Sequence, residues 1–323
     1  MKTVTTTSTG RDERVRRHRR ILARDGTSLA VTDWTRPTTA RTAVFLHGLC
    51  LNQAAWNIQI NQVLCQFGGD TRVISYDHRG HGDSASAPMQ TYRVDQLADD
   101  LDQILTTLRV TGPLTLIGHS LGAMVILTYL SRSERNTLAD VRGLVLCATA
   151  AGKLPERGVG RLLTMSALGP LASLVDHVPA RATGIATAPL CMALDRLRTH
   201  SSPQRQALLA VTINALATTP LSTAVGFLPS LRDFNQLHGL GNIKARTTIL
   251  SGGLDVLTPP DHSKEMATAI PGAVHVHIPS AGHMIPQQAP RIVGDAIART
   301  IAATELHCAR CSAPALAAEG VAS

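Results

Sequence analysis

The chain has 323 residues and a formal net charge of +8, with 44% hydrophobic, 17% charged and 3% aromatic residues. This composition is that of an ordinary globular protein, and the length suffices for one large core with an inserted lobe. No uninterrupted apolar run approaches the roughly 18 residues of a membrane-spanning helix, so no span is expected.

Much of the positive charge lies near the N-terminus, where residues 11–20 hold six arginines and two acidic residues. Residues 1–19 are predicted to form a disordered basic arm, because they contain little that could be buried. The other cations are not interleaved with aromatic side chains, so a nucleic-acid partner is not expected. A solvated arm is favoured, and peripheral contact with an anionic membrane is the less favoured alternative.

The arginines are not followed by the apolar region of a signal peptide. Arg19-Arg20 precede only Ile-Leu-Ala before the charged pair Arg24-Asp25, which is too short for that region. The sequence therefore predicts a cytoplasmic protein, whose six cysteines are reduced thiols.

Strand and helix patterns alternate in the first half of the chain. Two β-like segments around Asp25-Gly26 predict a hairpin over residues 20–35. Apolar strands are expected over 42–46, 71–76 and 141–148, with helices over 56–67 and 92–110. The second helix is predicted to be amphipathic, with an acidic outer face of Asp95, Asp99, Asp100 and Asp102. The alternation predicts right-handed βαβ units and a mainly parallel sheet.

Residues 113–127 combine a strand, a tight turn and a helix. The apolar strand stops at Gly118, a helical run begins at Leu121, and Ser120 lies between Gly118 and Gly122. A G-x-S-x-G motif in this setting exposes the serine Oγ at the edge of the sheet. Because the Leu121 N–H lies at the start of a helix, it is a candidate donor to an oxyanion.

The pattern changes after residue 151. Residues 152–240 lack a convincing strand, contain seven prolines, and are predicted to form a helical cap over the carboxyl edge of the sheet. Strands are expected again over 247–251 and 274–278, and helices over 260–270 and 290–303. The core would then comprise residues 20–151 and 241–304, followed by a loose tail over 305–323.

Four features, in this order, resemble the α/β-hydrolase superfamily. They are His47-Gly48, the segment Asp-His-Arg-Gly-His-Gly-Asp-Ser over 77–84, the motif around Ser120, and a late Asp255 followed by His283. The resemblance covers about residues 20–304 and is greatest to capped esterases of the monoacylglycerol-lipase-like and haloperoxidase-like branch. It implies an α/β-hydrolase fold: a mostly parallel eight-stranded sheet with helices on both faces and an inserted helical cap.

The resemblance also implies a catalytic set. Ser120 would be the nucleophile, His283 its general base, and Asp255 the acid that orients the imidazole. Asp261 is the alternative acid, but its place at the start of a helix favours a role toward the helix dipole. A serine at position 120 argues against the epoxide hydrolases and dehalogenases of this fold, which place an aspartate there.

An oxyanion hole requires two donors. By resemblance these are the N–H groups of Leu49 and Leu121, with Cys50 as the competitor of Leu49. Residues 77–84 are expected to be structural, and His47 to fix the turn. His307, Cys308 and Cys311 resemble half a metal site, but no second pair is suitably placed. No metal and no cofactor are therefore expected.

The sequence thus predicts acyl transfer from a carboxylic ester to water. The Leu, Ala, Val and Met residues of the cap favour a small-molecule apolar ester with a medium or long acyl chain over a charged substrate. Thioester, lactone and carbon–carbon bond hydrolysis and perhydrolysis share this machinery and stay open, as does the oligomeric state. An alternative of another class is a non-catalytic protein of the same fold that closes over an apolar ligand.

Overall fold

The computed structural model of the protein describes residues 15–35, 39–132, 138–158, 160–161 and 219–311, with side chains as far as residue 304. Eight strands form one sheet in the order β1-β2-β4-β3-β5-β6-β7-β8. Strands β1 and β2 pair antiparallel, as do β2 and β4, and all other neighbours are parallel. The strands are β1 (Val15–Leu22), β2 (Ser28–Thr35), β3 (Arg41–Leu46), β4 (Thr71–Tyr76), β5 (Thr111–His119), β6 (Leu138–Cys147), β7 (Arg246–Gly252) and β8 (Val274–Ile278).

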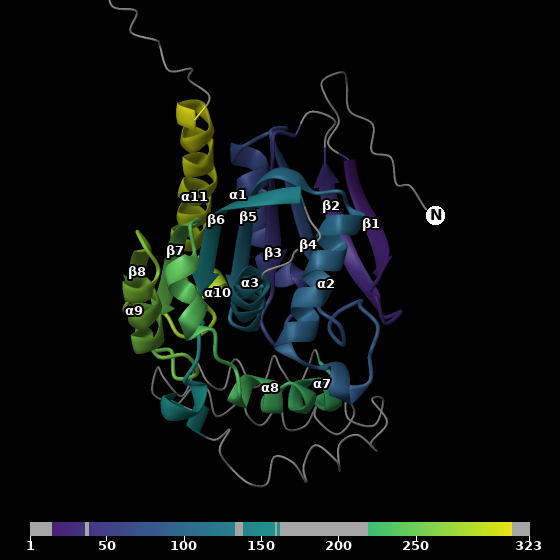
Figure 1. Cartoon of the computed structure of the whole chain (residues 1–323), viewed down its shortest axis with the longest axis vertical. Helices are drawn as coiled ribbons and strands as arrows, with labels where there is room; N and C mark the ends of the chain where they lie inside the picture. The colour runs from purple at the N-terminus through teal and green to yellow at the C-terminus, as the bar shows by residue number, and fades with distance from the viewer. Residues whose placement is uncertain (1–14, 36–38, 133–137, 159, 162–218, 312–323) are drawn as a thin grey trace, which may run out of the picture.

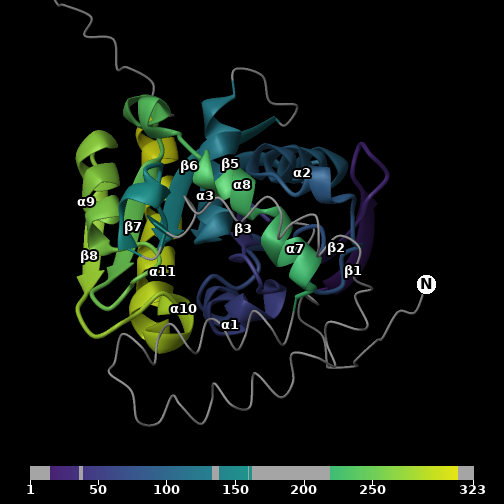
Figure 2. The same ribbon diagram turned by 90° about the horizontal axis from the view of Figure 1, so that it is seen from below.

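Helices cover both faces of this sheet (Figures 1 and 2). One face carries α1 (Asn57–Gln66) and α11 (Pro290–Cys311), which pack against each other, with the short α10 (Ile285–Gln288) beside α11. The other face carries α2 (Val94–Thr107), α3 (Leu121–Ser131) and α9 (Pro260–Ala269). The expected eight-stranded, mostly parallel sheet between two helical layers is confirmed.

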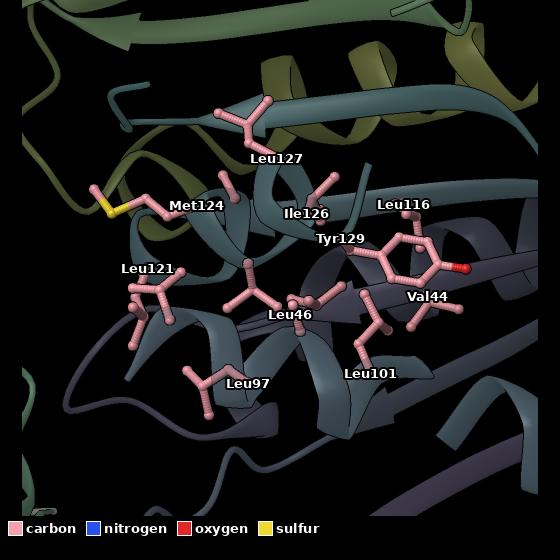
Figure 3. Close-up of a cluster of buried hydrophobic side chains, with 14 of the residues drawn as sticks. Val44, Leu46, Leu97, Leu101, Leu116, Leu121, Met124, Ile126, Leu127 and Tyr129 are labelled. Carbon is pink, nitrogen blue, oxygen red and sulfur yellow. The ribbon is translucent and has the colours of Figure 1, made fainter. Parts of the chain in front are cut away.

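The central strands are buried on both sides, which explains their continuous apolar sequences. In β3, Val44 and Leu46 join one hydrophobic cluster, whereas Ala43 and Phe45 join the cluster on the opposite face. Figure 3 shows part of the first cluster, where these β3 side chains meet residues of α2, β5 and α3. This double burial fixes the ends of β3 and β5, from which two of the candidate site segments emerge.

The first hairpin is longer than predicted. Strand β1 begins at Val15, and all eight of its residues pair with β2, so the boundary of the predicted disordered arm at residue 19 is wrong. In β1 only Ile21 is buried, because the strand lies at the sheet edge and depends on backbone pairing rather than on apolar burial. Arg19 also pairs with Asp33, at 3.5 Å. Residues 1–14 of the predicted arm lie outside the described residues.

Helix α11 also extends further than predicted. It continues to Cys311 rather than ending near Ala303, so the first part of the predicted loose tail, residues 305–311, is helical. This segment contains neither glycine nor proline, and nothing in it stops a helix. The side chains of His307, Cys308 and Cys311 and all of residues 312–323 lie outside the described part.

Most of the predicted cap, residues 162–218, lies outside the described residues, and the cap boundaries stay a prediction. Its described elements are η3 (Leu154–Glu156), α7 (Leu221–Gly226), α8 (Leu228–Arg232) and η5 (Leu237–Asn242). Helices α7 and α8 lie beneath the sheet in Figure 1. Helix α7 touches the core through Thr223, whose hydroxyl donates to Tyr92 Oη at 3.3 Å.

The acidic face expected on α2 is only partly exposed. Asp100 and Asp102 are buried, at 1% and 4% exposure. The fully buried Arg79 donates to both oxygens of Asp100, at 2.8 and 2.7 Å, and to Asp25 at 2.7 Å. Asp100 therefore points inward because a buried cation requires it, which apolar spacing along α2 does not reveal.

Candidate active site

Ser120 occupies a strained turn between β5 and α3. Its φ and ψ are 50° and −117°, a conformation that costs a non-glycine residue about 1–3 kcal/mol. Its N–H donates to the Cys147 carbonyl at 2.9 Å, and its carbonyl accepts from the Thr149 hydroxyl at 3.0 Å. These bonds hold Ser120 in the strained turn.

The two flanking glycines are required by close backbone approach. A Cβ on Gly118 would lie 2.5 Å from the Ala123 nitrogen, and one on Gly122 would lie 2.4 Å from the Leu46 carbonyl oxygen. Both distances are far below van der Waals contact, so any side chain would force the turn open. The G-x-S-x-G spacing therefore reflects the packing of α3 against the ends of β3 and β5.

The structure brings the three predicted residues together from distant parts of the chain. The Oγ of Ser120 lies 3.0 Å from Nε2 of His283, whose Nδ1 lies 2.9 Å from Oδ2 of Asp255. Asp255 follows β7, and His283 follows β8. Asp261, the alternative acid, lies on the exposed first turn of α9 and pairs with Lys264 at 3.1 Å.

Four hydrogen bonds reach the Asp255 carboxylate. Its Oδ1 accepts the N–H groups of Leu257 and Thr258, each at 2.9 Å, and its Oδ2 accepts the Thr258 hydroxyl at 2.8 Å and His283 Nδ1. Burial by itself would raise the pKa of Asp255, but His283 and these donors hold it below its ordinary value. Asp255 is therefore an anion that faces the imidazole. Thr258, three residues after Asp255, is not part of any motif that the sequence shows.

His119 ties the loop of His283 to the turn of Ser120. Its Nε2 lies 2.8 Å from the backbone oxygen of His283, so Nε2 carries the proton and donates. Its Nδ1 is buried, has no hydrogen-bond partner among the described residues, and faces Gly48, where a Cβ would lie only 2.7 Å away. Burial lowers the pKa of His119 to about 3, and the ring stays neutral.

Residues 47–50, here called the oxyanion turn, lie against Ser120. A Cβ on Gly48 would come within 3.3 Å of the Ser120 Cβ. The N–H of Cys50 donates to Nε2 of His81 at 3.1 Å. Among the described residues, no group accepts the N–H of Leu49 or Leu121. Of the two competing donors in this turn, Cys50 is therefore engaged and Leu49 is available.

Three buried imidazoles join the oxyanion turn to the loop after β4. Nε2 of His47 accepts the backbone N–H of His78 at 3.0 Å, and His78 Nε2 donates to the His47 carbonyl at 3.1 Å. His81 Nδ1 donates to the Arg79 carbonyl at 3.0 Å. Burial lowers the pKa of His47 to about 4 and of His81 to about 3, and that of His78 well below its ordinary value. All three rings are neutral at physiological pH.

The comparison with known proteins assigns the family. Residues 43–296 match the alpha/beta hydrolase family, and the chain belongs to it. It is similar to an AB hydrolase superfamily protein of Bacillus subtilis, with 28% identity over 75% of this chain and 85% of the relative. It is also similar to a mouse (Mus musculus) sn-1-specific diacylglycerol lipase, with 26% identity over 80% of each chain. A non-heme chloroperoxidase of Kitasatospora aureofaciens is 37% identical over 34% of this chain and 37% of its own.

Solved structures agree in fold. A thermophilic esterase from Thermogutta terrifontis superposes with a TM-score of 0.67 at 23% identity, covering 89% of this chain and 99% of its own. The enol-lactonase from Burkholderia xenovorans gives 0.66 at 21% identity, covering 88% and 100%. Within the described ranges, no helix combines the length and apolar character needed to cross a membrane.

Proposed function

We propose that the protein is a serine hydrolase that cleaves a small carboxylic ester through an acyl-enzyme intermediate. The observation that carries the proposal is the continuous path from Ser120 Oγ through the His283 ring to the Asp255 carboxylate, with contacts of 3.0 and 2.9 Å. A serine hydroxyl needs an adjacent base to become a nucleophile, and the base needs an orienting partner. Both requirements are met here.

In the first half-reaction, Ser120 Oγ attacks the ester carbonyl carbon while His283 Nε2 takes the hydroxyl proton. The carbonyl oxygen becomes an oxyanion, which accepts hydrogen bonds from the N–H groups of Leu49 and Leu121. Collapse of this tetrahedral intermediate breaks the bond to the alkoxy oxygen, and His283 returns the proton to the leaving alcohol. Asp255 holds Nδ1–H in place and stabilises the imidazolium that forms.

In the second half-reaction, water replaces the alcohol. His283 takes one of its protons, the hydroxyl oxygen attacks the acyl carbon, and the acid is released as Ser120 regains its proton. No metal or organic cofactor enters these steps. An apolar acyl or alkyl substrate is supported by the family relatives, which include a diacylglycerol lipase.

A chain-length series of p-nitrophenyl esters from acetate to palmitate tests this proposal, alongside a lactone and a thioester. Ester turnover by the wild type, lost by at least about 10⁴-fold in Ser120→Ala, is the expected result. Labelling by a fluorophosphonate should follow the same pattern. Faster turnover of the lactone or thioester would reassign the substrate class. If the folded wild type showed no ester turnover and no labelling, the hydrolase proposal would be rejected and a ligand-binding protein of this fold would be favoured.

A further inference from the structure

The loop after β4 contains a histidine that the proposed mechanism does not use. His81 is 1% exposed and lies in the polar segment that follows β4. Its two ring nitrogens have opposite roles. Nδ1 donates to the Arg79 carbonyl at 3.0 Å, which leaves Nε2 as an acceptor for the N–H of Cys50 at 3.1 Å. The bond to Arg79 thus fixes the tautomer that the bond to Cys50 requires.

Arg79, whose carbonyl accepts the hydrogen bond from His81, is itself held in place. The Arg79 side chain is fully buried and pairs with the carboxylates of Asp100 and Asp25, each at 2.7 Å. Gly82, next to His81, has a φ of +51°, and a Cβ there would lie 2.4 Å from Asp77. The loop therefore presents the His81 ring in one orientation.

The oxyanion turn needs such support, because its backbone is unfavourable by itself. Cys50 has a φ of +59°, a left-handed conformation that is unfavourable for a residue with a Cβ. Cys50 is also buried, at 5% exposure. A buried N–H without an acceptor would add a second penalty. The bond to His81 removes that second penalty and holds the turn in its strained form.

We propose that His81 is a positioning residue for the oxyanion hole: by accepting the Cys50 N–H, its neutral ring fixes the turn in which the preceding N–H, that of Leu49, is left to meet the substrate oxyanion. The inference rests on the proposed function and deepens it. Phe227 of the predicted cap packs on the same ring, with centroids 5.9 Å apart, and is itself fully buried. This packing contributes to the burial of the His81 ring.

Two variants separate positioning from packing. His81→Phe keeps an aromatic ring and removes the acceptor, whereas the side-chain oxygen of His81→Gln restores an acceptor for the Cys50 N–H. Because a displaced donor costs up to about 100-fold, kcat for a p-nitrophenyl ester should fall about 10- to 100-fold in His81→Phe with KM unchanged. His81→Gln should stay within about fivefold of the wild type, since its amide oxygen can accept the same bond.

Inhibitor binding gives the sharper readout. A trifluoromethyl ketone, which forms an oxyanion on Ser120, should bind His81→Phe more weakly by the same factor as kcat/KM falls. The product carboxylic acid should bind both variants as it binds the wild type. A loss of kcat in His81→Phe accompanied by an equal loss of product binding and a collapsed melting temperature would show a packing role and overturn the inference.

One measurement is independent of activity. A nitrogen–nitrogen scalar coupling between the Cys50 amide and His81 Nε2 should be present in the wild type and absent in His81→Phe. An active wild type without that coupling, or His81→Phe with full kcat, overturns the role of His81 alone. A wild type with the coupling but without ester turnover or labelling rejects the proposed function, and the oxyanion role falls with it.

Discussion

Imidazole rings occupy two contrasting environments around Ser120. His283 faces a carboxylate, with Nδ1 at 2.9 Å from Asp255. The rings of His47, His78 and His81 instead exchange hydrogen bonds with main-chain groups. Within the described chain, no carboxylate accepts a hydrogen bond from these three rings. An imidazole that must gain a proton during a reaction needs an anion beside it. One that holds backbone groups in place, by donating at one nitrogen and accepting at the other, must stay neutral.

The hydrogen-bond partner, rather than burial alone, separates the two kinds of histidine. His283 is also largely buried, at 7% exposure, yet it has an ionised neighbour whose pKa is held low. His47, His78 and His81 are more deeply buried, and burial is the first cause of their lowered pKa values. The same side chain therefore serves as a candidate base in one set and as a neutral donor and acceptor in the other.

The largest expected effect comes from removing the anion beside His283. Asp255→Asn keeps the size of the side chain but presents an amide that stabilises the wrong imidazole tautomer. We expect kcat to fall about 10³- to 10⁴-fold, measured with the p-nitrophenyl ester that the wild type turns over best. Asp261→Asn is the matched control, because Asp261 is exposed and pairs only with Lys264 among the described residues. Equal losses in both variants would contradict the assignment of Asp255.

The buried histidines that stay neutral, His119 among them, should make the folded protein less stable in acid. The pKa is lowered to about 4 for His47 and to about 3 for His81 and His119, whereas unfolded histidines titrate near about 6.5. Below that pH the unfolded state binds more protons than the folded state. Stability is therefore complete above about pH 6.5 and is lost as the pH falls toward these folded values.

Urea unfolding at a series of pH values measures this loss. Each neutral histidine adds about 1.4 kcal/mol per pH unit to the slope of the unfolding free energy between about pH 6 and 4. His81→Gln should reduce the slope by about one such increment, because glutamine does not titrate. A slope that is unchanged in His81→Gln would show that the His81 ring takes up its proton over the same pH range in the folded and unfolded states, and it would contradict the neutral His81 ring.

The strand, turn and helix around Ser120 could be predicted from the sequence, and the reason is physical. Gly118 and Gly122 are demanded by backbone contacts, and a strand and a helix of unmistakable apolar character flank them. Asp255 and His283 could be predicted by resemblance because their order along the chain is that of the family, and the structure brings both to Ser120. The resemblance favours Leu49 over Cys50 as the donor, but the sequence does not reveal that the Cys50 N–H is engaged, since its acceptor, His81, lies 31 positions away.

Two errors in the predicted fold have one cause. The arginines of residues 15–19 offer nothing apolar to bury, which predicts disorder, yet these residues pair along the edge of β2. The apolar spacing of α2 predicts that Asp100 lies on the outer face, yet Asp100 binds Arg79. In both cases the stabilising partner is distant in sequence and polar. Apolar periodicity reports which residues meet the core and does not report such partners.

Thr258 lies beside the pair of Asp255 and His283, and its substitution should have a smaller effect on activity. The Thr258 hydroxyl donates to Asp255 Oδ2 at 2.8 Å and lies 3.3 Å from His283 Nδ1, so it restrains the carboxylate at the bond to the imidazole. Thr258→Val preserves shape and removes this donor. Since a hydrogen bond to a charged group contributes about 1.5–3 kcal/mol, a partial loss of restraint should lower kcat about tenfold and leave KM unchanged.

The pH profile distinguishes this role from packing. Burial raises the pKa of Asp255, and the Thr258 hydroxyl is among the groups that lower it, so the acidic limb of the kcat/KM profile should move to higher pH in Thr258→Val. Thr258→Ser keeps the hydroxyl and should restore both kcat and the limb, although it loses a buried methyl group and some stability. If Thr258→Ser lost as much kcat as Thr258→Val although it keeps the hydroxyl, the loss could not be assigned to the hydrogen bond from that hydroxyl to Asp255, and the restraint inferred for Thr258 would be wrong.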